Sequence, residues 1–246
     1  MDSSTLSKIL FIDIETVPFK ADFAELTAEL QTLWSEKYKI LKLRQPEKFP
    51  ETDDAALAFA NNAGIYAEFG KIVCISLGFI NNNADTQTFR VKSFANHDEK
   101  QLLTDFSALC KQFFKSKEHT FCGHNIKEFD IPYICRRMLI NEIPLPKILD
   151  IQGKKPWDIN FFDTLEMWKF GDYKNYTSLK LLSAIFGIHT PKDDIDGSQV
   201  ASVYYGENDL PRIATYCQKD VVATAQIFLK MNGLQAFNQE NVIVNK

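Results

Sequence analysis

The sequence predicts a mixed α/β fold in which helices cover both faces of a five-stranded sheet. Short apolar runs rich in β-branched and aromatic residues, such as residues 7–14, are typical of buried strands. Two such runs, residues 71–79 and 86–94, are separated by a polar turn at 81–85 and indicate a hairpin. Strands then alternate with helical segments along the chain, and this order predicts a mixed sheet with helices on both sides.

The remaining elements follow from the spacing of apolar residues. Residues 22–38 have apolar side chains at helical intervals, and an alanine-rich helix is expected at 54–67. Residues 98–117 have the pattern of an amphipathic helix. The other predicted elements are the strands 120–123 and 159–162 and the helices 129–140, 178–186 and 211–231, the last with Asp209 as its amino-terminal cap.

The length and composition are those of an ordinary globular protein. The 246 residues include 28 Lys and Arg against 32 Asp and Glu, which gives a formal charge of −4, and 45% of the residues are hydrophobic. This length suits one full domain that carries insertions. We therefore expect a single domain over residues 1–246, with a helical insertion at about 20–69 and a polar carboxyl-terminal tail at about 235–246.

Membrane and secretory features are not apparent in the sequence. The longest apolar stretch, residues 72–80, is much shorter than the roughly 20 residues that a membrane helix needs. The amino terminus lacks the basic segment and apolar core of a secretory signal. The five cysteines are scattered, with no Cys-x-x-Cys pair, so reduced and buried thiols are expected. These observations favour a cytoplasmic protein without a membrane partner.

The basic residues gather in the middle of the chain. Residues 111–192 contain 13 basic and 9 acidic side chains, whereas residues 1–110 contain 11 and 16. An acidic chain argues against a nucleic-acid-binding protein, which usually has a basic face, unless bound cations neutralise some of the acids. Candidates for contacts with phosphates are Lys127, Arg136, Arg137, Lys154, Lys155, Lys169, Lys174 and Lys180, although for any single one of them a solvated surface charge is the preferred interpretation.

Two acidic residues end the first predicted strand. Asp13 and Glu15 lie two residues apart, so both side chains project from the same face of the strand. Ligand sites in open α/β sheets gather at the carboxyl ends of strands, and two bare carboxylates there repel each other unless a cation or a proton intervenes. The alternative is that Glu15 points to solvent and caps a turn before Pro18.

Further acids stand at the ends or edges of other predicted elements. Tyr216 and Asp220 lie four residues apart and therefore on one face of a helix. Asp130 begins the helix that follows the strand 120–123, where it could simply be a cap. Asp163 and Glu166 have the spacing of a capping box, which we prefer to a role as a further ligand pair.

These segments together resemble the three motifs of DEDD-type 3′-to-5′ exonucleases of the tyrosine subclass, in particular the proofreading exonuclease domain of B-family DNA polymerases. The resemblance rests on Ile12-Asp13-Ile14-Glu15-Thr16, on Gly123-His124-Asn125 with Phe129-Asp130-Ile131-Pro132-Tyr133, and on Tyr216-Cys217-Gln218-Lys219-Asp220. It implies a ribonuclease-H-like fold. His124 departs from the family, which often has tyrosine there, and the chain leaves no room for a polymerase domain, so we expect a stand-alone nuclease.

The resemblance also implies the chemistry and the roles of individual residues. Two divalent cations, Mg²⁺ or Mn²⁺, would be held by four carboxylates, and their charges of +4 would balance the −4 of these acids. The metal ligands and catalytic acids would be Asp13, Glu15, Asp130 and Asp220. Tyr216 would be a catalytic residue that orients the attacking water. Thr16, Asn125 and Phe129 would bind the terminal nucleotide.

The expected activity is therefore the hydrolysis of nucleic acid from a single-stranded 3′ end to nucleoside 5′-monophosphates, with DNA favoured over RNA. An alternative is a non-catalytic nucleic-acid-binding module on the same fold, against which the presence of all four acids and the tyrosine argues. A third possibility is a structural domain whose carboxylates are caps and surface charges. The sequence leaves protein partners open.

Overall fold

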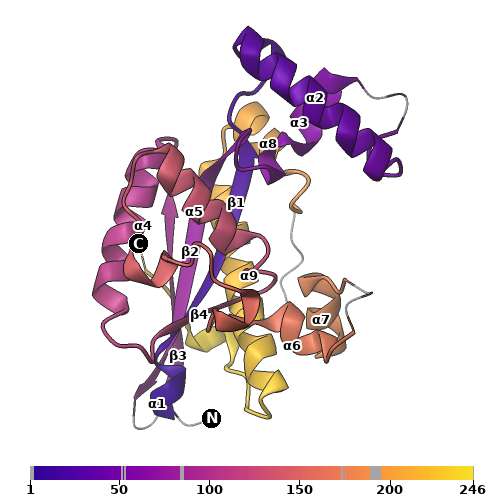
Figure 1. Cartoon of the computed structure of the whole chain (residues 1–246). Helices are drawn as coiled ribbons and strands as arrows, with labels where there is room; N and C mark the ends of the chain where they lie inside the picture. Colours follow the sequence, from indigo (N-terminus) through magenta and orange to yellow (C-terminus); the bar gives the residue numbers. More distant parts are fainter. Residues whose placement is uncertain are drawn as a thin grey trace.

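A mixed sheet forms the centre of the protein, with helices on both faces (Figure 1). The structure is a computed structural model, and it describes residues 3–245 except 51, 53, 84, 85, 173, 175 and 189–194. The predicted fold class is confirmed, with six strands in place of the five expected. They are β1 (Ile9–Pro18), β2 (Gly70–Asn83), β3 (Thr86–Ala95), β4 (Thr120–Gly123), β5 (Phe162–Asp163) and β6 (Val242–Asn245), in the order β5-β4-β1-β2-β3-β6.

Strand β1 lies in the interior of the sheet. It pairs antiparallel with β2 on one side and parallel with β4 on the other. The hairpin predicted from the sequence is present, because β2 and β3 pair antiparallel. Asn81 to Asn83, which we placed in its turn, belong to β2, and residues 84 and 85 lie outside the described residues.

The two faces of β1 pack against different helices. Leu10, Ile12 and Ile14 contact a core formed with α4 (Glu99–Phe113) and α5 (Asp130–Ile140). Ile9 and Phe11 face the opposite way, toward α9 (Leu210–Met231). Because side chains alternate along a strand, Asp13 and Glu15 continue the face that α9 covers.

The region for which we predicted a helical insertion forms a separate small core. It contains α2 (Ala28–Arg44) and α3 (Ala55–Asn62), which lie above the carboxyl end of β1 in Figure 1. Trp34 and Phe59 are fully buried between these helices. Helix α2 begins later than predicted because Thr27 caps it, whereas Asp22 caps the short 3₁₀ helix Phe23–Glu25.

The carboxyl-terminal segment differs from expectation. In place of a polar tail, residues 242–245 form β6, which pairs parallel with β3. The β-branched run Val242, Ile243 and Val244 suits a strand, and it covers what would otherwise be the exposed edge of β3. The strand predicted at 159–162 is shorter and later, because only Phe162–Asp163 pair with β4.

Four short α-helices complete the α-helices of the described part of the chain. They are α1 (Ser3–Leu6), α6 (Thr164–Lys169), α7 (Leu179–Ile185) and α8 (Val200–Ser202). None of the helices in the described ranges is long and apolar enough to cross a membrane.

Candidate active site

The site lies where β1 extends beyond the end of its neighbour β4. The last residue pair between β1 and β4 is Phe11 with Cys122, and β4 ends one residue later at Gly123, whereas β1 continues to Pro18. This leaves the β4 side of β1 open beside Asp13 and Glu15. Asp13 is partly exposed there, and Glu15 is buried, with 7% of its surface accessible. The alternative in which Glu15 points to solvent is therefore wrong.

Asp130 fills part of the open edge. It is the first residue of α5 and is buried. Its Oδ1 accepts a hydrogen bond of 3.2 Å from the backbone N–H of Ile14, the residue between the two acids of β1. Asp130 is therefore not a side-chain cap of its own helix, because its carboxylate is directed to the neighbouring strand.

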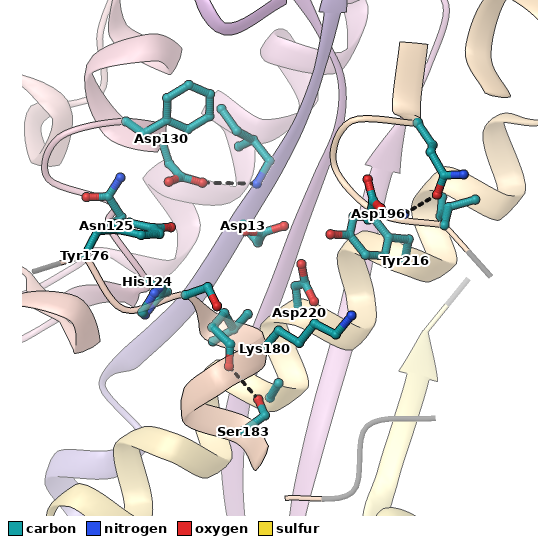
Figure 2. A pocket seen from close by; sticks show the side chains of 17 residues that line it. Asp13, His124, Asn125, Asp130, Tyr176, Lys180, Ser183, Asp196, Tyr216 and Asp220 are labelled. Atoms are coloured by element: carbon teal, nitrogen blue, oxygen red, sulfur yellow. Dashed lines mark hydrogen bonds between the residues drawn. The ribbon is translucent and has the colours of Figure 1, made fainter. Parts of the chain in front are cut away.

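Helix α9 brings the third group of residues. Tyr216 and Asp220 lie one turn apart, and the Tyr216 hydroxyl donates a hydrogen bond to the Asp220 carboxylate. Ile213, Cys217 and Val221 are fully buried against the sheet, and this packing fixes the helix so that its neighbouring face points at β1. Figure 2 shows Asp13 between Asp130 on one side and Asp220 with Tyr216 on the other.

Six of the eight predicted site residues line one cavity of about 830 Å³ (Figure 2). They are Asp13, Asn125, Phe129, Asp130, Tyr216 and Asp220. Glu15 and Thr16 instead line an adjoining cavity of about 250 Å³, which shares Ile14 and Phe129 with the first. A shift of the β1–β2 register between these two residues separates Thr16 from the line of the acids.

The clustered carboxylates hold their protons more tightly than ordinary acids do. Burial raises the pKa of Asp13 well above its usual value, and the charges of Asp220 and Asp130 raise it further. Burial and then the charge of Asp13 raise the pKa of Glu15 in the same way. Burial raises the pKa of Asp130 to about 7, although the hydrogen bond from Ile14 opposes the shift. The site therefore concentrates negative charge that calls for a cation.

The phenol of Tyr216 has little acid character in this setting. Burial raises its pKa well above the usual value, and the charges of Asp220, Glu15 and Asp13 add to the effect. The hydroxyl therefore stays protonated at neutral pH and acts through hydrogen bonds. This arrangement suits a group that orients a water molecule and does not suit a strong base.

The loop that carries Asn125 is held by Asp163, which the sequence indicated only as a cap. Asp163 Oδ1 accepts from the N–H of Asn125 at 2.8 Å and from the N–H of Leu165, at the start of α6. Its Oδ2 accepts from the N–H of Lys127 at 3.1 Å. Glu166 does not complete a capping box, because its carboxylate pairs with the Lys127 ammonium. Asp163 thus positions the loop and does not face the cavity as a ligand.

His124, which departs from the family pattern, is also fixed. Its Nε2 lies 3.0 Å from the carbonyl oxygen of Thr177 and its Nδ1 lies 2.9 Å from the hydroxyl of Thr164. Because a carbonyl only accepts, Nε2 carries the proton. Burial lowers the pKa of His124, so the ring is neutral at pH 7. It ties α6 to the segment before α7, and its ring contacts that of Tyr176 at the cavity.

One basic residue lines the large cavity in the described part of the chain, namely Lys180 on α7. Of the other basic candidates, Arg137 is buried and forms an ion pair with Glu99 at 2.5 Å. Lys127 pairs with Glu166 at 2.8 Å. Sequence alone could not separate these cases, because burial and partners distinguish them and charge does not.

The residues present fit a divalent cation. Ligand atoms of Asp13, Glu15 and Cys217 all lie within 4.8 Å of one another. In the described residues no hydrogen-bond donor contacts the Glu15 carboxylate, although that side chain is buried. A buried carboxylate without a donor, next to three other acids, is stabilised by a positive ion. Cys217 was not among the site residues predicted from the sequence, since a lone cysteine within a helix gives no signal.

A family of known proteins matches most of the chain. Residues 65–243 match a family described as predicted 3′-5′ exonucleases related to the exonuclease domain of PolB. The match includes Asn125, Asp130, Tyr216 and Asp220, and it begins after Asp13 and Glu15. No protein with a curated description matches the chain.

A solved structure extends the similarity in fold to nearly the whole chain. The family B DNA polymerase from the hyperthermophilic archaeon Pyrobaculum calidifontis is similar with a TM-score of 0.54 and 14% sequence identity. The similarity covers 95% of this chain and 26% of the polymerase chain. The chain thus spans about a quarter of that polymerase, and the similarity supports the ribonuclease-H-like fold.

Proposed function

The chain belongs to the family of predicted 3′-5′ exonucleases related to the exonuclease domain of PolB, and from that premise we propose that it is a metal-dependent 3′-to-5′ exonuclease. The substrate is a single-stranded 3′ end, and the products are nucleoside 5′-monophosphates. The observation that carries the proposal is the convergence of Asp13, Asp130, Asp220 and Tyr216, from three separate elements, on one cavity. DNA is favoured over RNA because the related exonuclease domain belongs to a DNA polymerase.

Two divalent cations, Mg²⁺ or Mn²⁺, fit the acids of this site. As the family resemblance implies, Asp13, Glu15 and Asp220 would hold one ion, and Asp130 together with Asp13 would hold the other. Bound ions of this kind supply hydroxide from water at neutral pH and stabilise the departing oxyanion. When ionised, the four carboxylates carry −4, and two divalent ions would offset this charge, which burial first and mutual repulsion second make unfavourable in the folded protein.

The chain's own residues place the substrate. The Tyr216 hydroxyl, next to Asp220, orients the attacking water in line with the phosphorus atom. Asn125 and Phe129 line the wall opposite α9 and hold the terminal nucleotide, and Thr16 approaches it from the adjoining cavity. Lys180 gives the cavity a positive charge directed at a phosphate. The presence of all four acids together with Tyr216 favours turnover over a binding-only module.

The test uses 5′-labelled DNA and RNA oligonucleotides of one sequence with Mn²⁺ or Mg²⁺. The wild type should produce a ladder that shortens from the 3′ end. Asp13→Asn should abolish the ladder, whereas the control Asp150→Asn, which changes an exposed aspartate outside the cavity, should retain it. Binding of the oligonucleotide without cleavage by the wild type would favour the binding module, and equal cleavage by wild type and Asp13→Asn would contradict the assigned site.

A further inference from the structure

Two thiols lie directly behind the acids of β1. Cys217 on α9 and Cys74 on β2 are fully buried, and their side chains are in hydrogen-bonding contact. Cys217 Sγ lies 3.3 Å from Asp13 Oδ2 and 3.4 Å from the Asp13 carbonyl oxygen. Cys74 is the partner of Glu15 in the β1–β2 register. The carboxylates therefore have a sulfur-rich side, which the exonuclease chemistry described above does not use.

The spacing of these atoms matches the demands of a soft metal ion. A tetrahedral zinc site has Zn–S bonds of about 2.3 Å and Zn–O bonds of about 2.0–2.2 Å, so its sulfur and oxygen ligands stand about 3.6 Å apart. The Cys217 Sγ to Asp13 Oδ2 distance of 3.3 Å is already close to this value. The third atom, from Glu15, lies within 4.8 Å of both, so a small rotation of its side chain completes three ligands.

A second observation points to a ligand at the same place. Glu15 is more than nine-tenths buried, and in the described part of the chain no hydrogen-bond donor reaches its carboxylate. No protein donor therefore compensates the charge of Glu15 when its carboxylate is ionised. A thiol that already donates to one carboxylate, beside a second carboxylate without a donor, is a mixed sulfur and oxygen ligand set.

We propose that Asp13, Glu15 and Cys217 form a binding site for one thiophilic divalent cation, such as Zn²⁺ or Cd²⁺, which excludes the hard ions from the acids of β1. On binding, the metal–sulfur bond replaces the S–H bond of Cys217, and the thiol proton is released to solvent. Thiolate and carboxylate together suit zinc and cadmium, whereas Mg²⁺ prefers an all-oxygen shell. The chain would then be inhibited by soft ions at concentrations where Mg²⁺ alone supports activity. The binding itself does not rest on the proposed exonuclease function; only the inhibition does.

The binding is tested with Cd²⁺ on the metal-free, reduced full chain, by following the ultraviolet charge-transfer absorption of the cadmium–thiolate bond. The wild type should show this absorption with one ion bound per chain. Cys217→Ser should weaken Cd²⁺ binding by at least about tenfold, because a hydroxyl is a poor ligand for a soft ion. The control Cys135→Ser changes a half-buried thiol on α5 and should leave the titration unchanged.

A second variant keeps the test decisive if Cys217→Ser does not fold. Asp13→Asn retains both thiols and removes one oxygen ligand, so it should also weaken the cadmium–thiolate signal. Absence of the signal in the wild type, or an equal signal in wild type, Cys217→Ser and Asp13→Asn, would overturn the proposal. Because absorption does not require turnover, this result is independent of whether the chain is a nuclease.

The inhibitory consequence is measured separately. If the exonuclease ladder is observed with Mg²⁺, Zn²⁺ or Cd²⁺ should suppress it in the wild type, and Cys217→Ser should require at least about tenfold more of either ion. Equal sensitivity of the two proteins, together with a cadmium–thiolate signal that Cys217→Ser abolishes, would show that the soft ion binds without excluding the hard ions, and would overturn that part of the proposal.

Discussion

The backbone N–H of Ile14 donates a hydrogen bond to Asp130 Oδ1 at 3.2 Å, and this contact joins the first helix residue of α5 to the strand between Asp13 and Glu15. It forms because β4 ends at Gly123 and leaves this side of β1 without a strand partner. The end of β4 therefore opens the cavity and also leaves the Ile14 N–H free to orient Asp130. An acid 116 residues away in sequence is fixed relative to β1 by a single backbone group.

Asp130 makes the stability of the metal-free protein depend on pH. Its pKa is about 7 in the folded protein and about 3.9 in an unfolded chain. Between these values the folded state binds the extra proton, so its free energy of unfolding falls as the pH rises. In EDTA, we expect the midpoint of thermal unfolding to fall as the pH is raised from about 5 to about 8. Over this range Asp130 lowers the free energy of unfolding by at most about 4 kcal/mol.

Asp130→Asn provides the control for this pH dependence. Asparagine keeps the oxygen that accepts from Ile14 but does not titrate, so the variant should lose less stability over the same range. With saturating Mn²⁺ the wild type should be stabilised most at the higher pH, because metal binding requires the deprotonated acids. An identical pH profile for wild type and Asp130→Asn would contradict the raised pKa.

Asp163 should be needed for stability and for the position of the Asn125 loop. Asp163→Ala removes the acceptor of four backbone N–H groups, those of Asn125, Lys127, Leu165 and, at 3.5 Å, Glu166. We expect a loss of about 3 kcal/mol in the free energy of unfolding, measured by urea denaturation, and a lower kcat. Asp163→Asn keeps one acceptor oxygen and should have an intermediate effect.

The matched control for Asp163 is Asp54→Ala. Asp54 also caps a helix, but among the described residues its side chain accepts from a single N–H, that of Leu57 on α3, and it is exposed. Its replacement should cost about 1 kcal/mol and leave nuclease activity unchanged. If Asp163→Ala were no more destabilising than Asp54→Ala, the additional contacts of Asp163 with the loop would contribute nothing to the free energy of unfolding.

Much of the fold could be predicted because the sequence patterns are local and strong. The apolar run before Asp13, the hairpin and the long helix α9 all appear close to their predicted positions. Strand β6 was not predicted, because its three β-branched residues follow a polar stretch and gain their stability from pairing with β3, which lies more than 140 residues earlier. Strand segments without a clear alternation of apolar and polar residues depend on such tertiary contacts.

The site could be predicted only as a set of candidates. Spacing placed Asp13 with Glu15 and Tyr216 with Asp220, since two residues on one strand or one helix turn share a face. It could not show that Glu15 is buried away from the large cavity, nor that Thr16 turns aside at a break in register. The thiol of Cys217 was missed because its importance arises only from the packing of α9 against β1.

Gly123 should not tolerate a side chain. A Cβ there would lie 1.9 Å from Ile126 Cγ2 and 2.9 Å from the backbone oxygen of Ile12. Gly123→Ala must therefore displace the loop after β4 or β1 itself, and we expect a loss of about 1–3 kcal/mol by thermal or urea denaturation. Gly206→Ala is the control, because its Cβ would meet no atom within 4 Å. Equal stability of the two variants would contradict the close packing at the end of β4.

Tyr216 should contribute to turnover and not to metal affinity. Its hydroxyl contacts Asp220 and faces the cavity, and its raised pKa keeps it protonated. Tyr216→Phe removes a hydrogen-bond donor without changing any carboxylate, so kcat should fall on the order of 10²-fold while the stabilisation by Mn²⁺ is retained. The control Tyr66→Phe, in the insertion next to Lys37, should leave kcat unchanged. If Tyr216→Phe lost the Mn²⁺ stabilisation instead, the hydroxyl would be part of the metal site, and its assignment as the group that orients water would be wrong.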